Sequence, residues 1–287
     1  MIKVRKFTES NYKAIFHNYK TLRMAIDPSK QIEELKYPEF YDVAINDKCN
    51  AMCSFCYVSA LKTGNNFENV QEKIDSFFGS MDENQRPFQV AIGGAGEPTL
   101  HPEFISILKK FYDTGIVPNY TTNGMHLTDE IIDATKKYSG GVALSCHPHL
   151  DKVWKKATYR YYEAGIRTNL HVIISDKKSI DRFFEIYKEF HGIVEYFVLL
   201  PYTVKGRATE TTLDFDDLFN RLKEMKDVKD IAFGANFYPY LMNNDISWLD
   251  VSLYEPEILS KYLVMNDDMP IYASSFSTEV LSKNNLK

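Results

Sequence analysis

Short apolar runs alternate with segments of helical spacing along most of this chain, and this alternation constrains its fold more than any other feature. Six apolar runs recur between residues 41 and 200, and apolar side chains at helical spacing follow each of them. Runs that are apolar at successive positions are typical of strands covered on both faces. The pattern predicts a parallel sheet with helices outside, either a barrel or a doubly wound sheet. The predicted strands cover residues 41–45, 88–92, 116–120, 141–145, 168–175 and 194–200.

Segments of unusual composition follow four of these predicted strands. They are the cysteine-rich residues 49–56, the glycine-rich residues 93–98, and the polar residues 121–124 and 146–149. In parallel α/β folds, ligands bind at the carboxyl ends of the strands. We therefore expect the functional site to lie where these four segments meet.

The predicted strand–helix units divide the chain into three parts. Residues 1–40 form an N-terminal extension, residues 41–212 form the barrel or sheet, and residues 213–287 form a C-terminal extension. Six apolar side chains at helical spacing predict an amphipathic helix over residues 8–26, which Asp27-Pro28 would end. The C-terminal extension is rich in Tyr, Phe and Met, and we expect it to cap the barrel mouth.

Composition and charge exclude several classes of protein. The chain has 287 residues, of which 44% are hydrophobic and 25% charged, as expected for a globular protein with a full-sized core. A formal net charge of -5 provides no excess of basic residues for general nucleic-acid binding. No apolar run is long enough to span a bilayer, and the N-terminus has no apolar signal-peptide core. We therefore expect a cytoplasmic protein that binds no membrane.

Three of the four cysteines, Cys49, Cys53 and Cys56, lie within eight residues. Such crowding does not suit a disulfide framework. Three thiolates can hold one soft metal centre from one side, but they cannot fill four coordination positions. A [4Fe–4S] cluster with one open iron fits this number, because a fully ligated cluster takes four cysteines. The alternative is a zinc site completed by His147 or His149.

The sequence resembles the radical S-adenosylmethionine (SAM) superfamily. Cys49, Cys53 and Cys56 are similar to the C-x3-C-x-aromatic-C loop of that family, with Phe55 as the aromatic residue. Residues 94–98, Gly-Ala-Gly-Glu-Pro, resemble its glycine-rich segment after the second strand. The resemblance implies an α/β fold, a partial (β/α)6 TIM-like barrel flanked here by the N-terminal helical extension and the C-terminal capping extension.

The same resemblance implies the cofactors and the reaction. The three cysteines would hold a [4Fe–4S] cluster whose open iron binds the amino and carboxylate groups of SAM. One-electron reduction, by a donor such as flavodoxin or ferredoxin, would cleave SAM to methionine and a 5′-deoxyadenosyl radical. This radical would abstract a hydrogen atom from the substrate. The cofactor carries this chemistry, and the protein positions it.

Candidate cofactor contacts lie at the ends of the predicted strands. Gly93, Gly94 and Gly96 have no Cβ, so the backbone can pass close to a ligand there. Glu97 is a candidate partner for the ammonium group of SAM, and the alternative is that it holds its own loop. By resemblance, the main chain at Leu200 would lie near the adenine. The expected contacts are Phe55, Tyr57, Gly94, Gly96, Glu97, Thr122, Asn123, Ser145, Ser175 and Leu200.

Cys146 is the one cysteine outside the cluster loop. With His147 and His149 it follows the fourth predicted strand, where substrate is expected to enter. It is therefore a candidate catalytic residue: a substrate-side thiol, a hydrogen-atom donor or a ligand. The alternative is a partly buried cysteine with a packing role, beside two histidines of a turn.

The segment after the sixth predicted strand bears on the substrate. Residues 201–207 resemble a stretch in superfamily members that carry a SPASM-type C-terminal domain with auxiliary clusters, many of which modify peptides. The leading hypothesis is therefore a radical enzyme acting on a peptide or protein side chain. No cysteine follows Cys146, so this SPASM-like tail lacks the ligands for auxiliary clusters. The alternatives are a radical enzyme acting on a small molecule or nucleotide, and a non-catalytic iron–sulfur or zinc protein.

Overall fold

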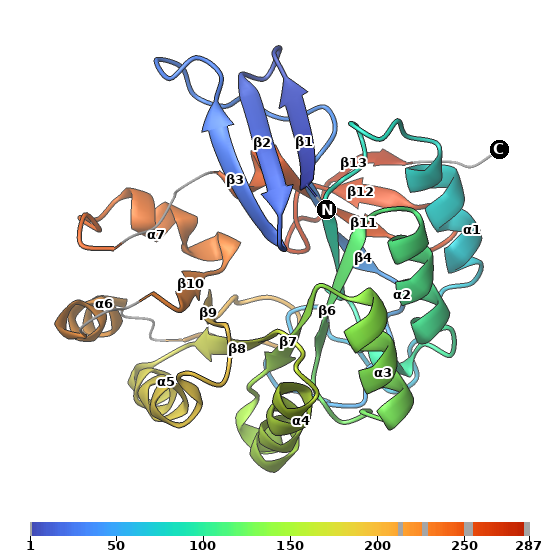
Figure 1. Cartoon of the computed structure of the whole chain (residues 1–287). Helices are drawn as coiled ribbons and strands as arrows, with labels where there is room; N and C mark the ends of the chain where they lie inside the picture. Colours follow the sequence, from blue (N-terminus) through green and yellow to red (C-terminus); the bar gives the residue numbers. More distant parts are fainter. Residues whose placement is uncertain (1, 212–214, 226–228, 250–254, 284–287) are drawn as a thin grey trace.

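Ten strands form one sheet in the computed structural model, which describes residues 2–211, 215–225, 229–249 and 255–283 (Figure 1). Seven parallel strands make up its main part, and each lies beside the one before it in the chain. They are β4 (Phe40–Ala44), β5 (Gln89–Ile92), β6 (Val117–Thr122), β7 (Gly141–Ser145), β8 (Thr168–Ile174), β9 (Tyr196–Pro201) and β10 (Ile231–Phe233). This continuous winding is that of a barrel, because a doubly wound sheet reverses its strand order at a switch point.

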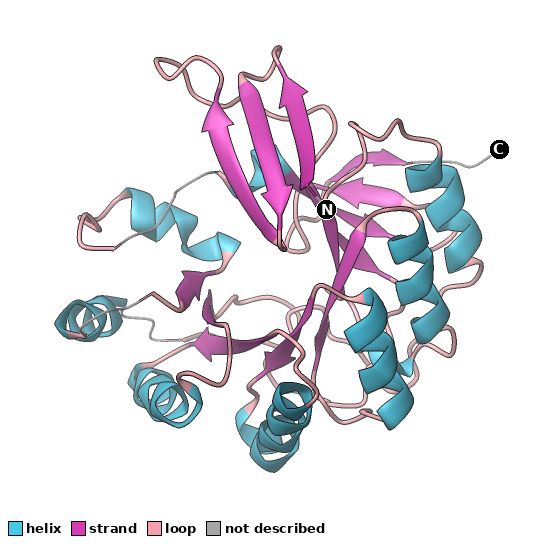
Figure 2. Ribbon diagram, viewed as in Figure 1, coloured by secondary structure: helices cyan, strands magenta, loops and turns pink. Residues whose placement is uncertain are grey.

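Helices cover the outer face of these strands (Figure 2). The connections hold α1 (Val70–Ile74) with a π-helical turn at Asp75–Gly79, α2 (Phe104–Asp113), α3 (Asp129–Tyr138), α4 (Asp151–Glu163) and α5 (Lys177–Phe190). Local sequence fixes their starts. The Thr128 side chain accepts a hydrogen bond from the Ile131 amide at the start of α3, and Asp176 and Ser179 form a capping box at the start of α5.

Burial alternates along the barrel strands. In β8 every second residue from Thr168 to Ile174 is buried, whereas Asn169, His171 and Ile173 between them are half-buried. Successive side chains of a strand point to opposite faces, so the half-buried set lines the interior of the curved sheet. The partial (β/α)6 barrel is thus confirmed, and β10 adds a further parallel strand at its edge.

The N-terminal extension is a three-stranded antiparallel sheet, so the helix predicted over residues 8–26 is wrong. It consists of β1 (Ile2–Phe7), β2 (Tyr12–His17) and β3 (Lys20–Ala25). Asn18 and Tyr19 have φ angles of 53° and 62°, as the two central residues of a tight hairpin turn require.

The helix prediction failed because β2 carries apolar residues on both of its faces. Tyr12, Ala14 and Phe16 are buried at the two-residue spacing of a strand, but Ile15 on the opposite face is also apolar. With apolar residues on both faces of the strand, the spacing matches that of an amphipathic helix as well.

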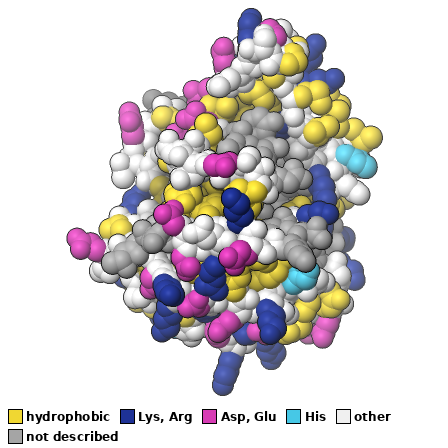
Figure 3. All heavy atoms as spheres, turned by 90° about the vertical axis from the view of Figure 1, so that its left-hand side faces the viewer, with side chains coloured by type: hydrophobic (Ala, Val, Ile, Leu, Met, Phe, Trp, Pro, Cys, Tyr) yellow, Lys and Arg dark blue, Asp and Glu magenta, His cyan; other side chains and the backbone are white. Residues whose placement is uncertain are grey.

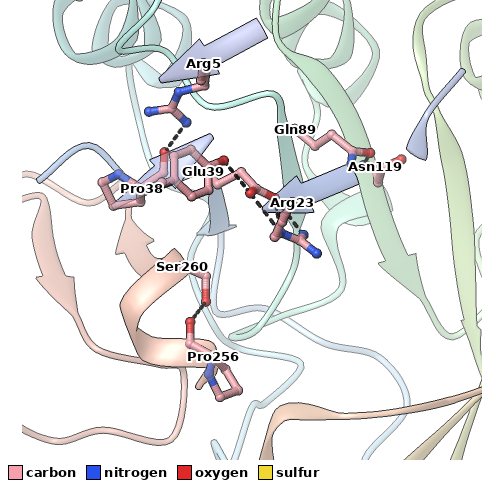
Figure 4. Close-up of polar contacts among 9 residues, drawn as sticks. Arg5, Arg23, Pro38, Glu39, Gln89, Asn119, Pro256 and Ser260 are labelled. Carbon is pink, nitrogen blue, oxygen red and sulfur yellow. Dashed lines mark hydrogen bonds and ion pairs between the residues drawn. The ribbon is translucent and has the colours of Figure 1, made fainter. Parts of the chain in front are cut away.

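Glu39, the residue before β4, anchors the N-terminal sheet to the barrel (Figure 4). Its buried carboxylate accepts a 2.6 Å hydrogen bond from the Tyr12 hydroxyl and pairs with Arg23 at 2.6 Å. Arg5 is also buried and donates to the carbonyl oxygens of Tyr37 and Pro38. Each of these buried charges is hydrogen-bonded, which lowers the cost of removing it from water.

The C-terminal part extends the sheet at its other edge. β11 (Ser260–Val264) pairs in parallel with β4, and β12 (Pro270–Tyr272) and β13 (Val280–Lys283) continue the sheet in antiparallel fashion. Among the residues described in this part, three α-helices precede these strands in the chain: α6 (Phe215–Glu224), α7 (Tyr238–Met242) and α8 (Pro256–Leu259). Within this part, Phe276 packs on Tyr57 of the cysteine loop, with ring centroids 4.6 Å apart. The boundary predicted at residue 212 lies outside the described residues.

Figure 3 shows the side of the molecule on which α6 and α7 lie. Hydrophobic atoms reach the surface there, among acidic and basic side chains. Across the described residues, no helix has the length and apolar character needed to cross a membrane.

Candidate active site

The loop that carries Cys49, Cys53 and Cys56 follows β4 and is fixed by main-chain hydrogen bonds. The Cys49 amide donates to the Leu61 carbonyl at 2.9 Å, and the Cys56 amide donates to the Cys53 carbonyl at 3.3 Å. Met52, between the first two cysteines, has a φ of 52°. All three cysteines are free thiols.

Arg207 follows the carboxyl end of β9, the last strand of the predicted barrel, and its side chain binds the cysteine loop that follows the first. Its Nε donates to the Cys53 carbonyl at 3.0 Å, its Nη1 donates to the Ala60 carbonyl at 2.9 Å, and its amide donates to the Cys56 carbonyl at 2.9 Å. The segment after the sixth predicted strand thus holds the cysteine loop, a role that the sequence analysis did not assign to it.

Two further side chains lie next to the sulfur atoms. His149 Nε2 lies 3.7 Å from Cys53 Sγ and 3.1 Å from the Ala51 carbonyl. Asn123 Nδ2 donates to Asn50 Oδ1 at 2.9 Å and lies 3.9 Å from Cys49 Sγ. The loops after β6 and β7 therefore meet the cysteine loop, as expected when the carboxyl ends of all strands converge at one end of a barrel.

Burial raises the pKa of the Cys53 thiol to about 12 and also raises the pKa of Cys49. The guanidinium of Arg207 opposes the shift at Cys53. Metal ligation requires the thiolate, so these thiols lose their protons when they bind a metal centre.

The donor set suits a cluster better than a single ion. No group of three His, Cys, Asp or Glu side chains in the described part of the chain is placed to hold one metal ion. In a [4Fe–4S] cluster each cysteine binds a different iron, so the three sulfur atoms need not converge on one point. The three free thiols on one loop therefore fit a [4Fe–4S] cluster with an open iron.

The glycine-rich loop after β5 lies against the cysteine loop. The Tyr57 hydroxyl donates to the Gly94 carbonyl at 2.9 Å and lies 3.3 Å from Ser275 Oγ, and burial raises the pKa of Tyr57 to about 12. Gly94 has a φ of 87°, and a Cβ there would lie 2.9 Å from the ring of Tyr262. A side chain at this position would therefore be strained and would also collide.

Gly96 brings the two loops into direct contact. A Cβ at Gly96 would lie 2.5 Å from the Lys48 carbonyl oxygen and 2.6 Å from Asn46 Oδ1. The neighbouring Glu97 amide donates to the same Lys48 carbonyl at 2.8 Å. Only glycine permits this approach directly before Cys49.

The carboxylate of Glu97 accepts hydrogen bonds from neighbouring residues of the protein. Its Oε1 accepts from the hydroxyls of Thr99 and Thr122 at 2.7 Å, and its Oε2 accepts from the Asn123 amide at 2.7 Å. The residue is 3% exposed. These contacts support the alternative in which Glu97 holds its loop, and contact with an ammonium group stays a prediction.

The remaining strand-end residues differ in what they face. A cavity of about 570 Å³, within the usual size of ligand sites, fills the barrel interior, and Thr121 and Leu200 line it. Thr122 points instead toward Glu97. Ser145 is the last residue of β7 and belongs to the half-buried set that faces the barrel interior. Ser175 lines a neighbouring cavity of about 230 Å³.

Phe55 and Cys146 line the same 230 Å³ cavity. The ring of Phe55 meets His147 edge-on, with ring centroids 5.1 Å apart. The Cys146 thiol is buried in the hydrophobic core, lies 3.7 Å from the Leu144 carbonyl, and has a raised pKa because of burial. This environment favours the packing role, and a catalytic role of Cys146 stays a prediction.

Two polar residues of the barrel interior were missed by the sequence analysis. Asp42 in β4 and His171 in β8 both line the 570 Å³ cavity. The sequence contains a signal for both residues, because each is a titratable residue within an otherwise apolar strand. Only the face of the strand, which the structure supplies, shows that both point inward.

Comparison with known proteins places the barrel in one family. Residues 43–199, more than half of the chain, match the family model described as the radical SAM superfamily. The tungsten-containing aldehyde ferredoxin oxidoreductase cofactor-modifying protein of Pyrococcus furiosus is 30% identical over 91 residues, which are 31% of this chain and 24% of that protein.

Solved structures show similarity of fold over a larger part of the chain. SuiB of Streptococcus suis bound to its precursor peptide SuiA matches with a TM-score of 0.67 and 15% identity, over 88% of this chain and 63% of SuiB. The enzyme anSMEcpe with bound SAM and the Cp18Cys peptide matches with a TM-score of 0.60 and 12% identity, over 84% of this chain and 75% of anSMEcpe. The chain thus spans less than two thirds of SuiB and about a quarter of the Pyrococcus protein.

Proposed function

Since this chain belongs to the radical SAM superfamily, we propose that it modifies a side chain of a peptide or protein by abstracting a hydrogen atom. The chain is a radical SAM enzyme, and its family implies a [4Fe–4S] cluster and SAM as cofactors. The nature of the substrate is the part of this proposal that goes beyond the family.

The residues of the site fit both cofactors. Cys49, Cys53 and Cys56 would hold the cluster, and the glycine-rich loop and the strand ends around the barrel cavity would hold SAM. When bound and reduced, the two together supply a 5′-deoxyadenosyl radical, methionine being the other product.

The chain itself positions the reactants. Arg207, Asn123 and His149 fix the cysteine loop at the carboxyl ends of the strands. Tyr57 holds the Gly94 carbonyl through a hydrogen bond, and the ring of Phe276 packs on that of Tyr57. The barrel interior gives the substrate a confined space, which protects a reactive intermediate from side reactions.

One observation carries the peptide proposal. The likeness to SuiB covers 88% of the chain and so must include residues outside the family match at 43–199. SuiB and anSMEcpe were both solved with a bound peptide. Shared architecture beyond the barrel therefore supports, for this chain, a substrate of the same class.

A small-molecule substrate is the second candidate. The Pyrococcus relative is described as a cofactor-modifying protein, and it is more similar in sequence than either peptide-bound enzyme, although over only 91 residues. We also expect an electron donor such as flavodoxin or ferredoxin, and a reducing, cytoplasmic location in which the cluster persists.

Transfer of deuterium from substrate to cofactor separates the two candidates. Extract of the source organism grown in D2O is divided into a macromolecular and a small-molecule fraction, and each is incubated with reconstituted enzyme, dithionite and SAM. Mass spectrometry of the 5′-deoxyadenosine should show deuterium with the macromolecular fraction only, and digestion of that fraction with protease should abolish the transfer.

The Cys53→Ala variant is the control and should form no 5′-deoxyadenosine. Deuterium that comes only from the small-molecule fraction would support the second candidate and contradict the peptide proposal. SAM cleavage without deuterium transfer from either fraction would also contradict it.

A further inference from the structure

The interior of the partial barrel is a cavity whose two ends differ. It extends from Tyr19, at the tip of the β2–β3 hairpin, to Leu200 near the carboxyl end of β9. The hairpin tip lies at the end away from the cysteine loop. There the ring of Tyr19 packs near Gly140, and the Arg167 guanidinium lies 5.0 Å from the ring centroid.

The charged groups at the hairpin end of the cavity neutralise each other. Arg167 forms a bidentate pair with Glu195, in which both N···O distances are 2.5 Å. Arg167 Nη1 also donates to the Asn18 carbonyl in the hairpin turn. This end of the cavity thus offers no unpaired charge to a ligand.

Amide side chains in the next layer are also paired. Asn119 Nδ2 donates to Gln89 Oε1 at 3.1 Å and to the Val90 carbonyl at 3.3 Å. Figure 4 shows Gln89 and Asn119 side by side, near the Arg23–Glu39 pair. These hydrogen bonds join β5 and β6 where the two strands line the cavity.

Asp42 differs from every other charged group that lines the cavity. Its carboxyl group forms no hydrogen bond or ion pair with any residue that the structure describes. Removal from bulk water raises its pKa to about 7, with no opposing cation. The Asp42 carboxyl group acts electrostatically on the phenols of Tyr57 and Tyr262, whose pKa values are raised mainly by burial. Asp42 is half-buried and lines the cavity, so a ligand there can reach its carboxyl group. A carboxyl group that is largely removed from water and has no protein partner is costly, so its retention points to a ligand.

His171 lies on another wall of the same cavity, in β8. Burial lowers its pKa to about 4, so it is a neutral imidazole at physiological pH and does not compensate the charge of Asp42. Three strands, β5 to β7, lie between β4 and β8 in the sheet, so the two groups line different walls of the cavity. A neutral imidazole supplies one hydrogen-bond acceptor and one donor to a ligand between them.

We propose that the barrel cavity receives a positively charged group of the substrate, an amine or a guanidinium, with Asp42 as its counter-ion and His171 as a neutral hydrogen-bonding partner. The inference rests on the proposed function, in which the substrate enters this cavity beside the cofactor. It adds the chemical class of the side chain that is bound. For a peptide substrate, that class is a basic residue near the site of modification.

Binding of two matched probes tests this inference without any radical chemistry. Nα-acetyl-lysine methylamide and Nα-acetyl-norleucine methylamide differ only in the charged amine at the end of the side chain. Their affinities for reconstituted enzyme with SAM are measured by ligand-observed NMR at pH 8. Wild type should bind the lysine derivative at least about tenfold more tightly, as expected for a desolvated charge pair. Asp42→Asn should reduce the preference to less than about threefold.

Asp113→Asn is the matched control, because it removes a carboxylate that is paired with Lys109 on the surface of α2. It should keep the wild-type preference. Iron content checks that each variant folds, and Asp42→Ser replaces Asp42→Asn if the latter does not fold. Equal binding of the two probes by wild type, or no binding of the lysine derivative, would overturn the inference.

Loss of SAM affinity in Asp42→Asn, equal in size to the loss for the lysine derivative, would also overturn it, because Asp42 would then serve the cofactor. SAM cleavage by wild type is measured in parallel. Cleavage without a preference for the lysine derivative rejects this inference and leaves the enzyme assignment intact. A preference without cleavage rejects the enzyme assignment instead.

Discussion

Arg207 is the residue that joins the last barrel strand to the cysteine loop. Its guanidinium donates to the carbonyl groups of Cys53 and Ala60, and hydrogen bonds from charged donors are worth about 1.5–3 kcal/mol each. We predict that Arg207→Gln loosens the loop, so that the reconstituted protein loses most of its iron during gel filtration. The iron retained per chain is the measurement.

Arg221→Gln is the control for this prediction. Arg221 pairs with Asp181 on the surface at 2.5 Å, and surface pairs contribute about 0–1 kcal/mol. This variant should retain iron as wild type does. Equal iron retention in both variants would show that Arg207 does not hold the loop.

Asp42 allows a prediction about stability that needs no substrate. Its pKa is about 7 in the folded protein and 3.8 in the reference state, so the folded chain keeps a proton that the unfolded chain releases. The group therefore costs stability increasingly as pH rises from about 4 to about 7. At about 1.4 kcal/mol per pKa unit, discounted for water in the cavity, the cost at pH 8 is on the order of 3 kcal/mol.

We predict that Asp42→Asn melts at a higher temperature than wild type at pH 8, and that the difference shrinks toward pH 5. Thermal denaturation of the reconstituted proteins under anaerobic conditions measures both. Asp113→Asn should show little difference at either pH. A variant less stable than wild type at pH 8 would mean that the Asp42 carboxylate has a partner in the folded protein.

At the level of single residues, sequence analysis located the site better than it assigned roles. The cysteine spacing predicts the cluster ligands, because metal coordination restricts both residue type and number, and this assignment stays a prediction. The role of Glu97 depends on Thr99, Thr122 and the Asn123 amide, which approach it only in the folded chain. No spacing in the sequence reports such a convergence.

The contact between the cysteine and glycine-rich loops depends on Gly96. A Cβ there would lie 2.5 Å from the Lys48 carbonyl oxygen, in backbone that cannot move without shifting Cys49. We predict that Gly96→Ala separates the loops and lowers iron content and SAM cleavage together. Iron analysis and 5′-deoxyadenosine formation in the same sample measure this.

Gly79, at the end of the π-helical turn, is the matched control. A Cβ there would have its nearest contact at 3.8 Å, and the residue has no left-handed φ angle. Gly79→Ala should therefore leave both measurements unchanged and raise stability by about 0.4–1 kcal/mol. If Gly96→Ala behaved like Gly79→Ala, the loops would not meet as the structure indicates.

Elements with one strong period were predicted well. The run at 141–145 coincides with β7, and the helix predicted over 151–164 coincides closely with α4 (Asp151–Glu163). The N-terminal sheet was mistaken for a helix because Ile15 masks the alternation of Tyr12, Ala14 and Phe16. The turn at Asn18 and Tyr19 was the available signal against a helix, since asparagine readily adopts a left-handed φ angle.

For the molecule as a whole, β4 is a central strand and not an edge strand. It pairs with β5 on one side and with β11, about 220 residues later in the chain, on the other. We predict that the amides of Phe40–Ala44 exchange with deuterium as slowly as those of β5–β8, because both neighbours protect them. β10 pairs on one side only, among the residues described, and should exchange faster. Exchange of β4 at the rate of β10 would contradict the pairing with β11.

The position of the C-terminal strands could not be predicted from sequence. Repeated strand–helix units predict which strands neighbour each other, because such connections are short and right-handed. The strand β11 has only five residues and no such connection to β4. Its place depends on tertiary contacts, such as the packing of the Tyr262 ring against Gly94, that no local pattern encodes.

The assignment as a radical SAM enzyme is tested most directly by cleavage of SAM in a matched pair of cysteine variants. Wild type, Cys53→Ala and Cys146→Ala are reconstituted anaerobically, and 5′-deoxyadenosine is measured after addition of dithionite and SAM. Wild type and Cys146→Ala should each bind about four irons per chain and form 5′-deoxyadenosine, whereas Cys53→Ala should do neither. Zinc in place of iron in wild type, or 5′-deoxyadenosine formed by Cys53→Ala, would contradict the assignment of the cysteine loop as the cluster site.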